Sequence, residues 1–312
     1  GRFAWKAAGL FVMLEAGKRK GRIIMAYDLR FVHLGITIQH LQNHITIFGF
    51  SIAFYGIIIG IGMLLGITLA ARDAARRGIG EDTIYDFALF GIIVGVMGAR
   101  LYYVIFQWEN YRGNLLEILN LRAGGLAIYG GVIGGIVSLA VFCKRKNKNF
   151  LMLADSLILG VLVGQILGRW GNFFNAEAFG RYTDSLFAMQ IKRAVVNPIM
   201  IDAALLQQLV TVNGVEYIQV HPTFLYESLW NLGLLLFLLR HRDKKRFEGE
   251  IFFLYLGGYG LGRVWIEGLR TDSLLLPGTG IAVSQALAGL CVLLALCCLF
   301  YGRKRAARKA EK

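Results

Sequence analysis

Charged residues are scarce in this sequence of 312 residues. Asp, Glu, Lys and Arg make up 17% of the chain, whereas about 25% is usual in soluble domains. Hydrophobic residues make up 56% of the chain, and the mean hydropathy is +0.55. This composition argues against one or two soluble domains and indicates a membrane protein.

Several enzyme motifs are missing as well. The sequence contains no Ser-His-Asp set, no cluster of zinc ligands and no Walker loop. The four cysteines have no paired C-x-x-C spacing and lie within or beside apolar segments: Cys143, Cys291, Cys297 and Cys298. We therefore expect small buried hydrophobic side chains at these positions and no disulfide.

Seven apolar stretches are long enough to cross a membrane, which takes about 20 residues each. They are Ile45–Ala71, Ile84–Gln107, Gly124–Cys143, Phe150–Gly168, Pro222–Leu239, Ile251–Leu269 and Ile281–Tyr301. The sequence therefore predicts an all-α, polytopic membrane protein with seven transmembrane helices.

Short basic blocks follow every second predicted span. They occupy residues 71–77, 144–148, 240–246 and 303–312. Lys and Arg concentrate in cytoplasmic loops, so we predict that the N-terminus lies outside and the C-terminus inside. The net charge of +14 is divided among these blocks, which argues against a nucleic-acid partner, because such a partner needs a basic patch on a soluble domain.

The connection between the fourth and fifth spans, residues 169–221, is long enough to fold by itself. We predict a small extracytoplasmic cap there, with a hairpin at the Asn-Gly pair of TVNGVEYIQVHPT. The membrane domain is expected to cover 25–302, followed by a basic cytoplasmic tail, 303–312. Residues 1–24 look detached from this plan, either as a non-native extension or as an interfacial segment.

Polar residues gather near the outer ends of the predicted spans. They are Arg100, Tyr129, Arg169, Asn172, Asn175, Glu177, His221, Tyr226, Glu227, Tyr259, Arg263, Glu267 and Arg270. Charges at membrane depth are costly, and they usually pair or face a cavity. Tyr259, Arg263 and Glu267 are spaced by four residues and so share one helix face, on which Arg263 and Glu267 can pair.

Some of these residues also have purely structural explanations. Arg270 can extend to the interface, and Tyr226 and Tyr259 are typical of an aromatic belt. Arg100 can serve as a partner for a carboxylate such as that of Glu227 or Glu267. Arg169 is different, because a glycine, two asparagines and a glutamate follow it within eight residues, which is more than an anchor needs.

Several arginines near an outer leaflet point to phosphate chemistry. The guanidinium fork matches phosphate oxygens, and the nearest abundant phosphate is a phospholipid headgroup. Asn172 and Asn175 can hydrogen-bond a glycerol hydroxyl or an ester carbonyl, and Glu177 can accept a proton or orient an arginine. The residues thus favour a site that uses phospholipid over hydrolysis by a serine or a metal ion.

The stretch GRWGNFFNAEAFGR, residues 168–181, resembles the prolipoprotein diacylglyceryl transferase family. It matches every fixed position of the signature G-R-x-G-N-F-x-N-x-E-x-x-G. The segments FYGIIIG with Tyr55, GARLYYVIF with Arg100 and Tyr103, GGLAIYGGVIGG, HPTFLYE and YGLGRVWIEGLR resemble further motifs of the family. The resemblance runs from about Met25 to the basic tail.

The resemblance implies the first step of bacterial lipoprotein maturation. The diacylglyceryl group of phosphatidylglycerol moves to the lipobox cysteine of a prolipoprotein signal peptide, which forms a thioether and releases glycerol 1-phosphate. The resemblance implies no metal and no organic cofactor. It places the enzyme in the lipid bilayer of the bacterial plasma (inner) membrane as a multi-pass protein, with its active site toward the extracytoplasmic leaflet.

The family motifs also imply residue roles. Arg169 and Arg263 match two key arginines, which we assign with Glu177 to catalysis at the headgroup phosphate. Glu227 and Glu267 are expected to orient arginines. The full set expected to bind substrate is Arg169, Asn172, Asn175, Tyr55, Tyr103, Arg100, Tyr129, Glu227, Tyr259, Glu267 and Arg270.

The chain departs from many family members at Tyr129, where they carry a histidine that is a candidate base. A phenol keeps its proton near neutral pH, so the general base stays unassigned. Arg169 and Arg263 can supply a positive environment that favours ionisation of the substrate thiol.

Two other functions compete with the transferase. A transporter or channel for an anionic solute can use buried arginines as a selectivity site, but the polar groups cluster toward one end and inverted repeats are missing from the sequence. A lipid-binding scaffold without catalysis does not need an intact Arg-Asn-Glu signature.

Overall fold

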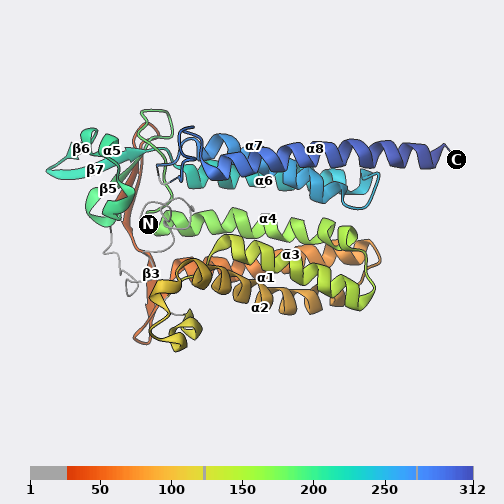
Figure 1. Cartoon of the computed structure of the whole chain (residues 1–312). Helices are drawn as coiled ribbons and strands as arrows, with labels where there is room; N and C mark the ends of the chain where they lie inside the picture. The colour runs from red at the N-terminus through yellow and green to blue at the C-terminus, as the bar shows by residue number, and fades with distance from the viewer. Residues whose placement is uncertain (1–26, 122–123, 272, 312) are drawn as a thin grey trace. The chain divides into compact units, whose positions relative to one another are not determined.

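The computed structural model describes residues 27–121, 124–271 and 273–311, so the segment 1–24 lies outside the described residues. Most of the described residues are helical (Figure 1). The chain divides into two compact units, one containing Ile67–Ile158 and the other Ile23–Gly66 with Leu159–Lys312. The predicted domain boundaries at 25 and 302 remain predictions.

The first unit is built on two closely packed helices, α2 (Glu81–Phe106) and α3 (Ile128–Lys146). A Cβ atom at Gly98 would lie 2.6 Å from the carbonyl oxygen of Gly130, so glycine is required for this approach. Two short 3₁₀ helices, η2 (Trp108–Asn110) and η3 (Leu115–Leu119), precede α3.

The same unit contains a buried ion cluster between the end of α1 (Phe54–Arg76) and the start of α4 (Phe150–Phe174). Arg77 lies 2.9 Å from Asp73 and 3.3 Å from Asp155, and both carboxylates are buried. Because each buried carboxylate has the guanidinium as partner, the cluster ties the two helices together.

The second unit contains a five-stranded antiparallel sheet in the order β2-β1-β5-β7-β6. The strands are β1 (Tyr27–Phe31), β2 (Ile36–Leu41), β5 (Met189–Lys192), β6 (Val210–Val212) and β7 (Val215–Val220). The prediction of an all-α fold is therefore incomplete, although the hairpin at the Asn-Gly pair is confirmed. Asn213 and Gly214 both have positive φ, as a two-residue primed turn requires.

Three short helices and a common apolar core complete the cap. The helices are η5 (Arg193–Val195), η6 (Pro198–Met200) and α5 (Ala203–Gln207). Leu29, Ile191 and Ile218, from three different strands, are at most 1% exposed. The cap thus includes strands from the N-terminal region as well as the predicted segment 169–221.

The first predicted span, Ile45–Ala71, is wrong over its first nine residues. They form a hairpin of β3 (His44–Ile47) and β4 (Phe50–Ala53), and α1 begins only at Phe54. Phe48 and Gly49 make the turn with positive φ. Short apolar runs fit a strand or a helix equally well, which is why hydropathy alone merged the two elements.

Three helices of the second unit pack side by side: α6 (Thr223–His241), α7 (Glu250–Glu267) and α8 (Val283–Ala310) (Figure 1). The 3₁₀ helix η7 (Arg242–Lys244) follows α6. α8 continues through the basic tail, and α4 extends six residues beyond the predicted end at Gly168, so that the first half of the signature is helical.

Among the described residues, five helices are long and apolar enough to cross a membrane: α1, α2, α3, α4 and α8. The helices α6 and α7 are not among them. They carry buried charged side chains, among them Glu227 and Glu267, which lower their mean hydropathy. The protein is thus a helical chain with several possible spans, and the count of seven stays a prediction.

All four cysteines are free, as predicted, but their burial differs from the expectation. Cys143 is buried, Cys297 is exposed, and Cys291 and Cys298 are half-buried. The reason is that α8 turns most of its apolar surface outward. In a membrane, lipid chains cover such a surface, so that a hydrophobic side chain there needs no protein partner.

Candidate functional site

The polar residues of the sequence signature lie where α4 ends. Glu177 donates its backbone N–H to the carbonyl of Asn172, and Ala176 donates to Phe173. These two bonds, with a positive φ at Ala176, form a Schellman motif in which alanine replaces the usual glycine. The motif turns the chain back so that Glu177 lies beside the last turn of α4.

A short hydrogen-bond chain links this turn to Arg169. The Asn172 side chain accepts from Arg169 Nη1 at 3.4 Å and donates to Glu177 Oε1 at 3.0 Å. Asn175 Nδ2 donates to the same Glu177 oxygen at 3.3 Å. Asn172 therefore contacts Arg169 directly, and Glu177 and Asn175 support Asn172 from the other side.

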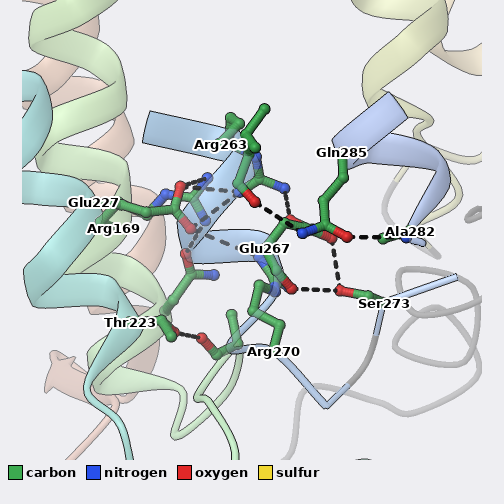
Figure 2. A network of polar contacts seen from close by, with 12 residues as sticks. Arg169, Thr223, Glu227, Arg263, Glu267, Arg270, Ser273, Ala282 and Gln285 are labelled. Atoms are coloured by element: carbon green, nitrogen blue, oxygen red, sulfur yellow. Dashed lines mark hydrogen bonds and ion pairs between the residues drawn. The ribbon is translucent and has the colours of Figure 1, made fainter. Parts of the chain in front are cut away.

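Three arginines surround one buried carboxylate, that of Glu227 on α6 (Figure 2). Arg263 Nη1 donates to both Glu227 oxygens at 3.0 Å, and Arg169 Nη2 lies 2.6 Å from Oε2. Arg270 Nη1 lies 3.8 Å from Oε1. Glu227 is only 3% exposed, so it joins the end of α4 to the end of α7 inside the protein.

Glu267 is the second carboxylate of this cluster. It pairs with Arg263 Nη2, as the spacing of four predicts, and accepts from Ser273 Oγ at 2.8 Å. Arg263 is thus held on both terminal nitrogens by carboxylates. The three guanidinium groups of this cluster outnumber the two carboxylates in contact with them, and guanidinium groups are suited to binding an anion such as a phosphate.

The start of α8 is fixed to the same region. Gln285 Nε2 donates to the carbonyl of Val264 at 2.8 Å, and its Oε1 accepts from the N–H of Ala282 at 3.0 Å (Figure 2). Residues from α4, α6 and α8 therefore all contribute to the surroundings of Arg263 on α7.

Tyrosines extend the polar surface along the helices. Tyr259 stacks on Tyr255 with ring centroids 5.5 Å apart, and Tyr255 Oη accepts from Gln165 at 2.8 Å. Tyr55 lies against Gly171, where a Cβ atom would stand 2.5 Å from its ring. Glycine at 171 is therefore needed for the approach of Tyr55 to the signature helix.

Three predicted residues, Arg100, Tyr103 and Tyr129, belong to the other unit. Arg100 donates all five of its N–H groups to backbone carbonyls: those of Glu117, Ile118, Asn120, Gly124 and Gly125. The expectation of a carboxylate partner for Arg100 is thus corrected, because its partners are carbonyl oxygens. Tyr103 is buried against Arg100. Tyr129 packs against the small apolar cluster that contains Tyr103.

Sequence reasoning missed Gln165, Tyr255 and Ser273. Tyr255 and Gln165 each lie four residues before a predicted site residue, so helix periodicity could have found them. Ser273 lies in a loop, where no periodic signal exists. His221, one of the polar residues near the ends of the predicted spans, contacts Tyr226 Oη at 3.3 Å, and burial lowers the pKa of its imidazole.

Known proteins with similar sequences belong to one family. The family model for prolipoprotein diacylglyceryl transferase matches residues 42–301. The chain belongs to this family. A phosphatidylglycerol–prolipoprotein diacylglyceryl transferase of Clostridioides difficile is 43% identical over 244 residues, which cover 78% of this chain and 89% of the relative. One of Bacillus anthracis is 45% identical over 235 residues, which cover 75% of this chain and 82% of the relative.

The part that matches the prolipoprotein diacylglyceryl transferase family contains the whole arginine cluster. It begins after β1 and β2 and ends within α8. The resemblance that rested on short motifs is thereby confirmed over most of the chain.

Proposed function

We propose that this chain transfers the diacylglyceryl group of phosphatidylglycerol to the lipobox cysteine of a prolipoprotein. The cysteine sulfur forms a bond to C3 of the glycerol that carries the acyl chains. The C–O bond at this carbon breaks, and its electron pair leaves with glycerol 1-phosphate. The thiol proton is lost as the thioether forms, so the overall reaction is a substitution at carbon.

The observation that carries this proposal is the group of three arginines around Glu227. A departing phosphate ester develops negative charge, and fixed cationic donors that already point at it lower the barrier. Arg169 and Arg263 are held by Glu227 and Glu267 and need little reorganisation. We assign both arginines to binding the headgroup phosphate, and Arg270 to stabilising the same negative charge.

The amide and phenol groups around this cluster supply the rest of the substrate site. Asn172 and Asn175 bind the glycerol part of the headgroup, and Glu177 orients the amides or accepts a proton. Tyr55 and Tyr259 line the lipid or peptide path. Arg100, Tyr103 and Tyr129 stay in the proposed substrate-binding set on the family resemblance alone, and the base for the thiol stays unassigned.

We further propose seven spans in the bacterial plasma membrane, with the cap and the site toward the extracytoplasmic side. The basic blocks after every second span support this orientation. α6 and α7 are less apolar than the other spans because they carry charged residues. These charged residues form ion pairs with one another, and membrane helices tolerate charges that are paired.

A transfer assay tests the proposed reaction. Purified protein, phosphatidylglycerol and a lipobox peptide are mixed, and both the lipidated peptide and released glycerol phosphate are measured. Replacing Arg169 with Ala should lower transfer by about 10²–10³, as loss of one preorganised charge donor does elsewhere. Arg193→Ala is the matched control, because this arginine is exposed and pairs with Glu216 in the cap.

Near-normal transfer by the folded Arg169→Ala protein would remove this residue from the mechanism. Absence of both products with folded wild-type protein would instead favour anion transport, and flux in liposomes would then be measured.

A further inference from the structure

A second site with positive charge lies near the other end of α7 and α8. The groove has a volume of about 650 Å³ and is lined by Arg246, Leu296, Leu299, Phe300, Arg303 and Lys304. Arg303 follows Gln285 of the arginine cluster by 18 residues on α8, or about 27 Å at 1.5 Å per residue. The groove is therefore separate from the proposed transfer site.

The groove is built on a fixed frame. Glu250, the first residue of α7, is fully buried and accepts from Arg303 Nε at 2.9 Å and from Nη2 at 2.7 Å. It also accepts the backbone N–H of Arg246. The ring of Phe247 lies against Gly302, where a Cβ atom would overlap it. These contacts hold the end of α8 against the loop that precedes α7.

The groove changes from apolar to basic along α8. This helix has 28 residues and is about 42 Å long, whereas the hydrocarbon core of a bilayer is about 30 Å thick. Its apolar sequence ends near Tyr301, and RKRAARKA follows. Leu296, Leu299 and Phe300 thus fall in the last turns beside acyl chains, and the cations fall at headgroup depth.

The charges of the groove do not cancel. Glu250 neutralises one charge through Arg303, while Arg246 and Lys304 are exposed. The Lys304 ammonium lies 5.9 Å from the centre of the Phe300 ring, so the cationic and apolar parts of the groove adjoin each other. A ligand that fits both parts carries a phosphate and an acyl chain.

We propose that this groove binds an anionic phospholipid. Its phosphate lies among Arg246, Arg303 and Lys304, and an acyl chain lies along Leu296, Leu299 and Phe300. A free phosphate leaves the apolar half uncovered, and a zwitterionic lipid brings a cation toward the basic half. The proposal goes beyond the transfer reaction, because the lipid bound here is a ligand and not a substrate.

Photocrosslinking of the full chain tests the proposal. The protein is placed in phosphatidylcholine nanodiscs with a phosphatidic acid that carries a diazirine on one acyl chain, and labelled peptides are mapped by mass spectrometry. We expect labelling within residues 296–304, competed by unlabelled phosphatidic acid and not by inorganic phosphate. The double substitution R246Q/K304Q should lower this labelling at least about tenfold, since each surface cation contributes to anionic lipid binding.

The substitution R305Q/R308Q removes two charges from the same tail outside the groove and is the matched control. Unchanged labelling in this control supports a defined site. If both double variants lost labelling equally, the labelling would reflect general charge attraction to the tail, and the proposal would be overturned. Equal labelling by a diazirine phosphatidylcholine would overturn it too, as would labelling confined to the arginine cluster. Peptide transfer, measured on the same protein preparations in separate nanodiscs that contain phosphatidylglycerol, verifies that each variant is folded.

Discussion

At the scale of single residues, Glu227 is the group on which the site depends. One carboxylate faces three guanidinium groups in a position that is 3% exposed. Replacing Glu227 with Gln leaves Arg169 and Arg263 facing each other without the charge between them. We expect the free energy of unfolding to fall by about 3–5 kcal/mol, as when a buried ion pair loses one partner. Thermal unfolding in detergent measures this change.

The ion pair of Arg193 with Glu216 provides the comparison. Its side chains are 42% and 50% exposed, and exposed pairs contribute less than about 1 kcal/mol. Glu216→Gln should therefore leave the unfolding temperature nearly unchanged. Similar effects of the two substitutions would mean that the carboxylate of Glu227 is not a structural hub.

Backbone strain at Ala178 gives a second prediction. This residue has φ of 56°, a conformation that costs a residue with a Cβ atom about 1–2 kcal/mol. Replacing Ala178 with Gly should raise the free energy of unfolding by about 0.5–1 kcal/mol, because the methyl group is only half-buried and the strain is relieved. Chemical or thermal unfolding of the purified protein measures the sign.

The same substitution at Ala188 should lower the free energy of unfolding. Ala188 is fully buried and has ordinary negative φ, so Ala188→Gly removes packing and adds freedom to the unfolded chain. A loss of stability at both positions would show that Ala178 is not strained. A gain at Ala178 with reduced transfer would indicate that a rigid turn at Glu177 matters for catalysis.

Residue-level reasoning from sequence was strong on helices and weak in loops. The pair of Arg263 with Glu267 followed from their spacing of four, and Glu227 was expected to orient an arginine. Ser273 and the carbonyl partners of Arg100 could not be predicted, because their positions depend on how irregular segments fold back.

At the scale of elements, sequence predicted the β6–β7 hairpin but not the strands β1 and β2. An Asn-Gly pair between β-prone residues specifies a turn locally. The turn between β1 and β2, Val32–Gly35, contains no Asn-Gly or Asp-Gly pair. The other neighbour of β1, β5, is about 160 residues away in the chain. Pairing over such a distance is decided by burial in the finished fold, which a local pattern does not contain.

The contribution of β1 to the cap can be measured. Leu29 in this strand is fully buried, whereas Ile36 in β2 is 50% exposed. Replacing Leu29 with Ala should lower the free energy of unfolding by about 2–5 kcal/mol, the usual cost of a cavity in a packed core. Limited proteolysis and thermal unfolding report this loss.

Ile36→Ala removes a similar side chain from the same sheet at an exposed position. We expect less than about 1 kcal/mol there, because little packing is lost. A small effect of Leu29→Ala would mean that the cap folds without its N-terminal strands.

At the scale of the whole molecule, composition predicted a helical membrane protein, because the share of apolar residues does not depend on side-chain contacts. The order of the basic blocks predicts the orientation of the chain, which stays a prediction. The number of spans is harder, because α6 and α7 carry the charged groups of the site. A function that places arginines and glutamates in a helix weakens the hydropathy signal that identifies a span.

Cysteine labelling separates seven spans from five. In a chain whose four native cysteines are replaced by serine, single cysteines are placed at Thr211 in β6, Lys244 in η7 and Arg308 in α8. A membrane-impermeant maleimide is added to spheroplasts before or after permeabilisation. We expect Thr211→Cys to react at once and Arg308→Cys only after permeabilisation, because α8 crosses the membrane in either case. Lys244→Cys decides the count: if α6 and α7 both span, it reacts only after permeabilisation, and immediate reaction would leave five spans.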